Sequence, residues 1–337
     1  MAKFAPKFAA IRFLVGVLTI PVWAIGCTQQ PAPNSSSSAT APLVSGNNPW
    51  PGYAGHYVAL KQDLFGKEGV TVKEAYFQSA TETITAFLAH KTDVSWVTSG
   101  DAIQIIEKEP SAKIIYLVDY SNGSDGILGR NITSPADLKG KTVGRENLLF
   151  ENVLLRAYLA KGKLTEKDIV IKDMTAADAA TAFASKKVDA AVSYEPWLTK
   201  AARQGNGKVI FSTKGTNLIA DVILAHKDTI ENRRPALLSY IRAIDKGVKL
   251  VNANDPEALK ITADKLGVKV DEVKEQLSGV KIFDLKSNQT IGFNLKNPNN
   301  MMKNLELTVN TAVATKVIPK PIATQALYDD SLVNSLK

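Results

Sequence analysis

Cysteine and histidine are scarce in this sequence. Its 337 residues include one cysteine and three histidines. A single cysteine excludes an intramolecular disulfide framework and any cysteine-rich zinc or iron–sulfur site. The histidines are scattered, and no two have the spacing of metal ligands: His56, His90 and His226. The sequence therefore predicts neither a metal site nor a cofactor.

Long runs of basic residues and catalytic groupings are also missing. Lys and Arg outnumber Asp and Glu by 41 to 33, a formal net charge of +8, and removal of the N-terminal segment described below would leave +5. A mildly basic surface without a basic run is not typical of a nucleic-acid-binding protein. No Ser/His/Asp or His-rich grouping indicates catalysis, so we expect a protein that is not an enzyme.

The composition that is present is that of a folded protein. Hydrophobic residues make up 45% of the chain and charged residues 22%, which excludes wholesale disorder. A chain of 337 residues is longer than one hydrophobic core usually holds, so two domains are expected.

The N-terminus has the pattern of a secretory signal. Residues 1–12 carry three basic side chains and no acidic one, and Phe13–Ile25 is an apolar run too short to span a bilayer comfortably. The sequence Ala24–Cys27 resembles the lipoprotein box of bacteria, although Ala24 stands where Leu is usual. This resemblance implies removal of residues 1–26, lipidation of Cys27 and anchoring at the periplasmic face of the cell membrane. The alternative is that Cys27 is a buried free thiol.

A spacer is predicted after the signal, over residues 27–46. Residues 28–46 contain three prolines, a run of four serines and no charge. Such a stretch buries too little apolar area to offset the entropy lost on ordering. We expect a disordered tether between the lipid and a folded domain.

From residue 49 onward, short β-branched runs alternate with helical patterns. The predicted strands are 70–77, 94–98, 114–120, 141–145, 169–174, 190–194, 209–212 and 221–225. The predicted helices between them are 53–65, 81–90, 101–107, 148–160, 176–185 and 196–203. Such alternation predicts an α/β fold with parallel sheets and right-handed crossovers. Beyond residue 227 the pattern is nearly all helical, over 229–253, 255–265, 270–278, 298–316 and 321–335.

Two half-similar segments, 82–94 and 178–191, each predict a helix, a turn and an acidic residue that opens an apolar strand. These strands end in polar or aromatic residues, at 96–101 and 193–197. Ligands of open α/β sheets bind at the carboxyl ends of strands. Two lobes with these strand ends facing each other would therefore form a cleft.

Three segments carry a resemblance to a known family: Trp50–Val70, Thr133–Gly144 and Asp189–Trp197. Together they resemble the nitrate/sulfonate/taurine/bicarbonate class of solute-binding proteins of ABC importers, over about residues 43–335. The resemblance implies a two-lobed type II periplasmic binding fold with a ligand cleft between the lobes. It also implies a monomer that captures a small solute and passes it to a membrane permease driven by an ATPase.

The resemblance also implies where the lobes divide. Two crossovers are expected near 119–126 and 219–222, with residues 43–120 and 225–337 in the first lobe and 121–224 in the second. A pyrimidine synthase of thiamine biosynthesis uses the same fold, with a histidine and a run of cysteines in its chemistry. Tyr53 stands at that histidine position here, so this chemistry is not expected.

The candidate ligand-binding residues lie at predicted strand ends or at the second crossover. They are Trp50, Tyr53, Trp96, Ser99, Asp101, Glu146, Tyr194, Glu195 and Asp221. Carboxylates beside aromatic faces suit a small cation, through charge-assisted hydrogen bonds and cation–π contacts. We expect a cationic or donor-rich nitrogenous solute such as guanidinium or an amine. Nitrate, bicarbonate, a sulfonate such as taurine, or an aminopyrimidine is the alternative.

Each candidate also has a structural interpretation. Asp101 and Glu195 could cap helices. Glu146 could pair with Arg145 or Lys141 at the surface, and Asp221 could serve the crossover alone. Buried positions within a strand and a helix suggest packing roles for Trp96 and His56. Trp50 and Tyr53 lie in a charge-free loop rich in Gly and Pro, where ligand contact is the better interpretation.

Overall fold

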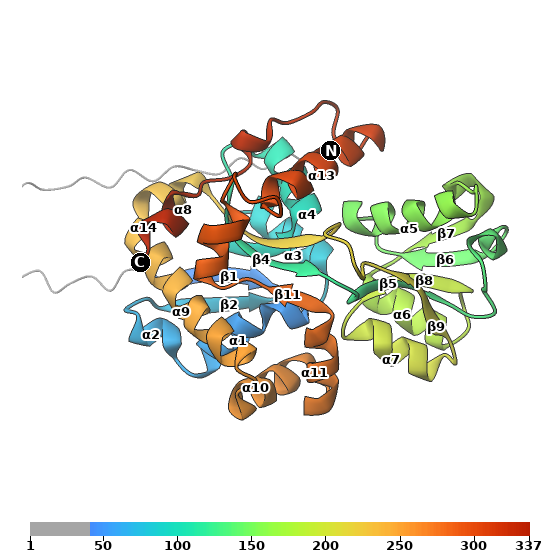
Figure 1. Cartoon of the computed structure of the whole chain (residues 1–337), viewed down its shortest axis with the longest axis horizontal. Helices are drawn as coiled ribbons and strands as arrows, with labels where there is room; N and C mark the ends of the chain where they lie inside the picture. Colours follow the sequence, from blue (N-terminus) through green and yellow to red (C-terminus); the bar gives the residue numbers. More distant parts are fainter. Residues whose placement is uncertain (1–40) are drawn as a thin grey trace, which may run out of the picture. The chain divides into compact units, whose positions relative to one another are not determined.

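Two β-sheets with helices around them organise the chain (Figure 1). The structure, a computed structural model, describes residues 41–337, which form one unit. The predicted signal, Cys27 and most of the predicted tether lie outside the described residues. Within 41–337, no helix combines the length and the apolar character needed to cross a membrane.

The first sheet has six strands in the order β11-β4-β10-β3-β1-β2. Their bounds are β1 (Leu43–Asn47), β2 (Val72–Tyr76), β3 (Val94–Thr98), β4 (Lys113–Ser121), β10 (Ala220–Ala225) and β11 (Val280–Ile282). Strand β1 pairs in parallel with β2 and β3, whereas β10 runs antiparallel to β3 and β4. Strand β11 closes the edge antiparallel to β4.

The second sheet has five strands in the order β7-β6-β8-β5-β9. Their bounds are β5 (Asp125–Gly129), β6 (Thr142–Arg145), β7 (Val170–Asp173), β8 (Ala190–Tyr194) and β9 (Lys208–Ser212). Strand β6 is parallel to β7 and β8, and β5 is antiparallel to β8 and β9. The chain enters this sheet between Ser121 and Asp125 and returns to the first sheet between Ser212 and Ala220.

The helices follow the strands, as the sequence pattern predicts for most of the chain. Around the first sheet lie α1 (Ala54–Lys61), α2 (Leu64–Lys67), α3 (Ala80–Leu88) and α4 (Ser99–Lys108). The second sheet carries α5 (Leu149–Lys161), α6 (Ala176–Ala184) and α7 (Trp197–Gln204). The C-terminal helices are α8 (Lys227–Asn232), α9 (Arg234–Asn252), α10 (Pro256–Leu266), α11 (Val270–Ser278), α12 (Leu285–Ser287), α13 (Met301–Ala314) and α14 (Ser331–Ser335). Short turns are η1 (Pro51–Tyr53), η2 (Pro135–Leu138), η3 (Glu166–Asp168), η4 (Asn288–Gly292) and η5 (Thr324–Ala326).

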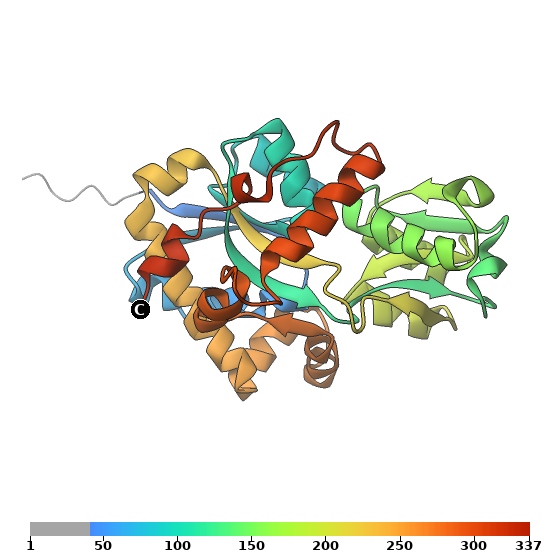
Figure 2. The ribbon, with the colours of Figure 1, turned by 45° about the horizontal axis from the view of Figure 1, so that its top comes forward.

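Local signals explain several helix starts. The side chains of Ser79, Thr98 and Thr175 cap α3, α4 and α6 by accepting a hydrogen bond from a backbone N–H three residues on. Helix α1 crosses α9 closely, because a Cβ at Gly247 would lie 2.1 Å from the carbonyl oxygen of Gly55. Helix α13 packs against α4 and lies in front of the first sheet in the view of Figure 2.

Apolar side chains fill both faces of the second sheet. Neighbouring residues of β5 point in opposite directions, so Ile127 packs with the α5 side and Leu128 with the α6 and α7 side. The largest apolar cluster surrounds the first sheet, and Phe150 and Tyr194 from the second-sheet half join it. Trp197 packs against both this cluster and the cluster on the α6 and α7 side, and it thereby connects the two cores.

Three expectations about secondary structure were wrong. Residues 43–46 belong to the buried strand β1 rather than to a tether, because pairing with β2 and β3 satisfies their backbone. The sheets are mixed rather than parallel, because β10 and β5 are inserted where the chain changes sheets. The predicted helix at 321–335 is reduced to η5 and α14, and Pro319 and Pro321 remove two backbone donors near its start.

Candidate functional site

The loops that follow β1 and β3 meet strand ends of the second sheet around one pocket. Its cavity volume is about 20 Å³, room for roughly one water molecule, so a solute can enter only if the pocket opens. Asn48, Trp50, Tyr53, Ala80, Val97, Thr98, Asp101, Asp125, Phe150, Tyr194 and Asp221 line it. The first sheet and its loops supply most of them, while Asp125, Phe150 and Tyr194 come from the second-sheet half.

Three buried carboxylates face this pocket. Asp101, Asp125 and Asp221 have exposed fractions of 0%, 3% and 4%. Among the lining residues, all within the described part of the chain, none is Lys, Arg or His. Burying like charges without a counter-ion is costly, so the arrangement favours either protonated carboxyls or a cationic ligand.

Protein groups occupy only some of the hydrogen-bond acceptor sites of these carboxylates. The Tyr53 hydroxyl donates to Asp221 Oδ1 at 2.7 Å, and the Thr98 hydroxyl donates to Asp101 Oδ2 at 2.8 Å. Asp101 Oδ1 and Asp125 Oδ2 are buried without a protein partner. Unpaired buried carboxylate oxygens are acceptors available to a ligand that donates hydrogen bonds.

Burial changes the acidity of the three groups. Loss of hydration, with smaller effects from nearby negative charges, raises the pKa of Asp101, Asp125 and Asp221 to about 7 each. These values lie in the range where a bound cation would displace protons. Such shifts are concentrated at functional sites in proteins, although structural networks also produce them.

Aromatic rings form the pocket walls. The Trp50 and Tyr194 rings meet edge to face, with centroids 6.0 Å apart, and Phe150 lies 6.0 Å from Tyr194. Asn48 donates from Nδ2 to the Tyr194 hydroxyl at 3.3 Å, which links the β1 loop to the end of β8. Aromatic faces beside carboxylates provide both shape and cation–π attraction.

Asp119, in strand β4, fixes the position of the loop that carries Trp50. The indole N–H of Trp50 donates to Asp119 Oδ2 at 2.9 Å, and a Cβ at Gly52 would lie 1.9 Å from the same oxygen. Only glycine lets the backbone approach this closely. Loss of hydration and the neighbouring Asp221 charge raise the pKa of Asp119 well above its usual value.

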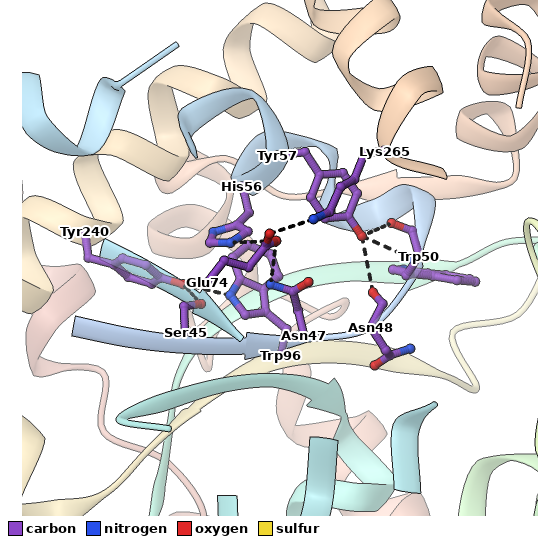
Figure 3. A network of polar contacts seen from close by, with 10 residues as sticks. All are labelled: Ser45, Asn47, Asn48, Trp50, His56, Tyr57, Glu74, Trp96, Tyr240 and Lys265. Atoms are coloured by element: carbon purple, nitrogen blue, oxygen red, sulfur yellow. Dashed lines mark hydrogen bonds and ion pairs between the residues drawn. The ribbon is translucent and has the colours of Figure 1, made fainter. Parts of the chain in front are cut away.

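A second polar network supports the same loop from the α1 side (Figure 3). The Tyr57 hydroxyl contacts the carbonyl oxygens of Asn48 and Trp50 at 3.2 and 3.1 Å. Nearby, Glu74 lies 3.6 Å from the buried His56 and accepts from Lys265 at 2.6 Å (Figure 3). Burial alone would raise the pKa of Glu74, but His56 and Lys265 lower it to about 2. Glu74 also accepts from Asn47 Nδ2 at 3.2 Å, so this network and the Tyr57 hydroxyl together hold the loop that carries Asn48 and Trp50.

The sequence-predicted residues divide into two groups. The structure brings Trp50, Tyr53, Asp101, Tyr194 and Asp221 together around the pocket. It places Trp96, Ser99, Glu146 and Glu195 elsewhere, which the next two paragraphs describe.

Trp96 and Ser99 have structural partners outside the pocket. Trp96 is 1% exposed in the middle of β3, and its indole N–H donates to the Tyr240 hydroxyl at 2.8 Å (Figure 3). The Ser99 hydroxyl donates to Asn304 Oδ1 at 2.8 Å, because its position at the start of α4 turns it toward α13. Both residues therefore serve packing around the first sheet.

Glu146 and Glu195 bind backbone rather than line the pocket. Glu195 accepts from the backbone N–H of Thr199 at 3.3 Å and from its hydroxyl, as the helix-capping alternative predicts. Glu146 accepts from Thr81 N at 3.1 Å, from the Thr81 hydroxyl, and from Ala176 N at 3.2 Å. It therefore joins the start of α3, beside the first sheet, to the start of α6, beside the second. Glu146 therefore has neither the ligand-binding role nor the surface ion pair that the sequence suggested.

Sequence reasoning missed four polar or aromatic lining residues: Asn48, Thr98, Asp125 and Phe150. Asp125 was hidden because the strand it opens, β5, lies in a glycine-flanked segment that was not predicted as a strand. Asp125 could have been found from the sequence, because it lies inside the first predicted crossover and is an acid that precedes apolar residues. Arg145, which the sequence offered as a surface partner for Glu146, donates to Asn147 Oδ1 at 2.7 Å and lies 3.3 Å from Asp173 instead.

Relatives of known sequence point to binding proteins. A protein of Brucella abortus, named as a binding protein with no ligand given, is 24% identical over 215 residues, which are 63% of this chain and 67% of that protein. A Bacillus subtilis protein that carries the name of an aliphatic sulfonates-binding protein is 23% identical, over 81% of this chain and 80% of its own length.

Solved structures show the same fold. The alkanesulfonate-binding protein SsuA from Xanthomonas axonopodis pv. citri, bound to MOPS, superposes with a TM-score of 0.70 at 17% identity. The match covers 86% of this chain and 98% of that one. The desulfurization enzyme DSZB has a TM-score of 0.62 at 15% identity, over 87% of this chain and 97% of its own.

These matches establish the fold class and the family. The two mixed sheets with helices have the α/β fold of the periplasmic binding proteins, as the resemblance in the sequence predicted. Residues 50–258, more than half of the chain, match the family described as NMT1/THI5 like. The chain belongs to the NMT1/THI5-like family.

Proposed function

We propose that the chain is the solute-binding component of an ABC importer and acts in the periplasm. The observation that carries the proposal is the pocket, which is built from loops and strand ends of both sheets and is lined almost entirely by buried residues. The family, and the names of its sequence relatives as binding proteins, support the same role. A permease and its ATPase would be the partners, and the lipid on Cys27 would keep the protein at the membrane.

Binding rather than catalysis fits the contents of the pocket. The fold also serves a desulfurization enzyme, so the fold alone does not decide. Within residues 41–337, the lining residues include no cysteine and no histidine, and the lining carboxylates have no basic partner to activate them. Incubation with a bound solute should therefore return it unchanged, and formation of a product would contradict this part of the proposal.

The names of the relatives and the lining of the pocket favour different classes of solute. The Bacillus subtilis relative and the SsuA structure from Xanthomonas axonopodis are named for sulfonates, and neither name supports the guanidinium or amine expected from the sequence. A sulfonate is therefore the candidate that these names favour. A sulfonate would need donors or positive charge, and no Lys, Arg or His lines the described pocket.

The lining of the pocket favours a small cation instead. Asp101, Asp125 and Asp221 are buried there, and two of them keep an unpaired oxygen. An anion would add a fourth negative charge, whereas a cation removes the cost of burying three. A guanidinium ion is small, planar and rich in donors, and it can stack on the aromatic walls. We therefore place a guanidinium-class or amine cation first and a sulfonate second.

Calorimetric titration with guanidinium, methylammonium, methanesulfonate and taurine decides between them. Asp221→Asn keeps an acceptor for the Tyr53 hydroxyl but removes the charge, and should weaken cation binding by about 10- to 150-fold, equivalent to 1.5–3 kcal/mol. Asp264→Asn is the matched control, because this carboxylate is 67% exposed on α10 outside the pocket. Tight sulfonate binding that Asp221→Asn leaves unchanged would overturn the cation and leave the importer role standing.

A further inference from the structure

Two of the three histidines, distant in sequence, meet at one end of the first sheet. His90 follows α3, Glu109 ends α4, and His226 follows β10. Strands β3 and β10 run antiparallel, and the pocket lies at the end where Thr98 pairs with Asp221. The group of His90, Glu109 and His226 lies at the opposite end of the same strands, where Val94 pairs with Ala225. It is thus separate from the solute pocket.

The ligand atoms of these three side chains converge. His226 Nδ1 lies 2.7 Å from Glu109 Oε1, and His90 Nε2 lies 3.8 Å from Glu109 Oε2. One ligand atom from each residue lies within 4.8 Å of the other two. A tetrahedral ion with metal–ligand bonds of about 2.0–2.2 Å needs its ligands slightly over 3 Å apart. The His90 and His226 rings are stacked at an interplanar angle of 19°, so the His90 ring must turn before its nitrogen points at such an ion.

Packing holds one imidazole and leaves the other accessible. The His226 ring stacks on Phe87 with centroids 3.8 Å apart and on His90 at 4.2 Å. Its side chain is 4% exposed and that of Glu109 is 18% exposed, whereas that of His90 is 63% exposed. Two ligands are therefore fixed before an ion arrives, and the third can turn from solvent to complete the site.

We propose that His90, Glu109 and His226 form a binding site for a borderline divalent metal ion such as Zn²⁺ or Ni²⁺. Two imidazoles and one carboxylate match the ligand preference of these ions, and not that of Ca²⁺ or Mg²⁺, which take oxygen ligands. With three protein ligands, a fourth position stays available to water or to a ligand from a partner. The proposal does not rest on the solute class or on the importer role.

The histidine resonances give a direct test, because the chain has only three imidazoles. Substoichiometric Ni²⁺ is added to the tag-free protein carrying Cys27→Ser, so that the thiol does not contribute. Paramagnetic broadening should affect the imidazole signals of His90 and His226 first and leave that of His56 sharp. Equal broadening of all three signals, or none, would overturn the site.

Calorimetry with Zn²⁺ supplies the second readout. Asn tolerates the left-handed backbone at position 90, where φ is 51°, so His90→Asn should not strain the chain. The substitution should weaken Zn²⁺ binding by at least about tenfold. Asp264→Asn is the control and should leave Zn²⁺ affinity unchanged, because this exposed carboxylate on α10 lies outside both the histidine group and the solute pocket. Unchanged affinity in His90→Asn, or lost affinity in Asp264→Asn, would contradict the proposed site.

Discussion

Asp101→Asn should make the protein more stable at alkaline pH while making it bind a cation less well. Asp101 is fully buried in the pocket, and its Oδ1 has no protein partner. The variant keeps an acceptor for the Thr98 hydroxyl and removes only the charge. Its effect on stability should therefore depend on whether the carboxyl of the wild type is ionised.

The pKa of Asp101 sets the size and sign of this effect. Burial raises this pKa from 3.8 to about 7, a difference of about 3 pH units, or about 4 kcal/mol as an upper bound. Between about pH 4 and pH 7 the folded chain keeps a proton that the unfolded chain has lost, so the free energy of unfolding falls as the pH rises. The variant lacks this dependence. It should gain about 2–4 kcal/mol over the wild type at pH 8 and little at pH 4.

Urea denaturation at pH 4, 6 and 8 measures the difference. Urea is chosen because guanidinium is itself the proposed ligand. The exposed Asp264→Asn should show no such trend. A stability difference between Asp101→Asn and wild type that is the same at all three pH values would refute the idea that this carboxylate is buried at an energetic cost.

Three further outcomes follow from other parts of the chain. Glu146→Gln should weaken solute binding by about tenfold without touching the pocket, since the charge-assisted bonds from Thr81 and Ala176 are reduced; equal calorimetric affinity would contradict a bridging role. Gly52→Ala should lower the free energy of unfolding in urea by about 1–3 kcal/mol because its Cβ meets Asp119, whereas Gly100→Ala, with 3.4 Å to its nearest neighbour, should be neutral or stabilising; equal effects would count against the close approach. Cys27→Ala should release the protein from the membrane fraction or block signal processing, and an unchanged membrane-bound mature protein would exclude the lipid anchor.

The alternation of strands and helices was sufficient to predict most of the fold. Strands β3 and β8 were predicted to the residue, because β-branched runs between clear turn signals leave little freedom. Strand β1 was missed because Leu43 and Val44 follow a proline-rich and serine-rich stretch, and only pairing with β2 and β3 makes them a strand. Strand β10 was predicted, but its antiparallel direction was missed because direction depends on where the chain changes sheets.

Site residues were predictable from the sequence where neither packing nor helix capping explained the residue types in a loop. Trp50 and Tyr53 stood in a charge-free loop and do line the pocket, and Asp101 lines it although it also lies in the first turn of α4. Glu195 shows the opposite outcome, because capping fully explains it. The bridge made by Glu146, and the meeting of His90 with His226, depend on contacts across 30 or more residues and have no local pattern.

The pH dependence of guanidinium affinity tests the central claim, that the pocket is built for a cation, most directly. Burial raises the pKa of Asp101, Asp125 and Asp221 to about 7, so a cation that enters must displace protons. The affinity measured by calorimetry should therefore rise with pH below about 7, by about tenfold per pH unit for each proton displaced, and level off above it. Buffers of different ionisation enthalpy should show proton release on binding. A guanidinium affinity that is flat or falls as the pH rises, beside methanesulfonate binding that strengthens at low pH, would contradict a cation site.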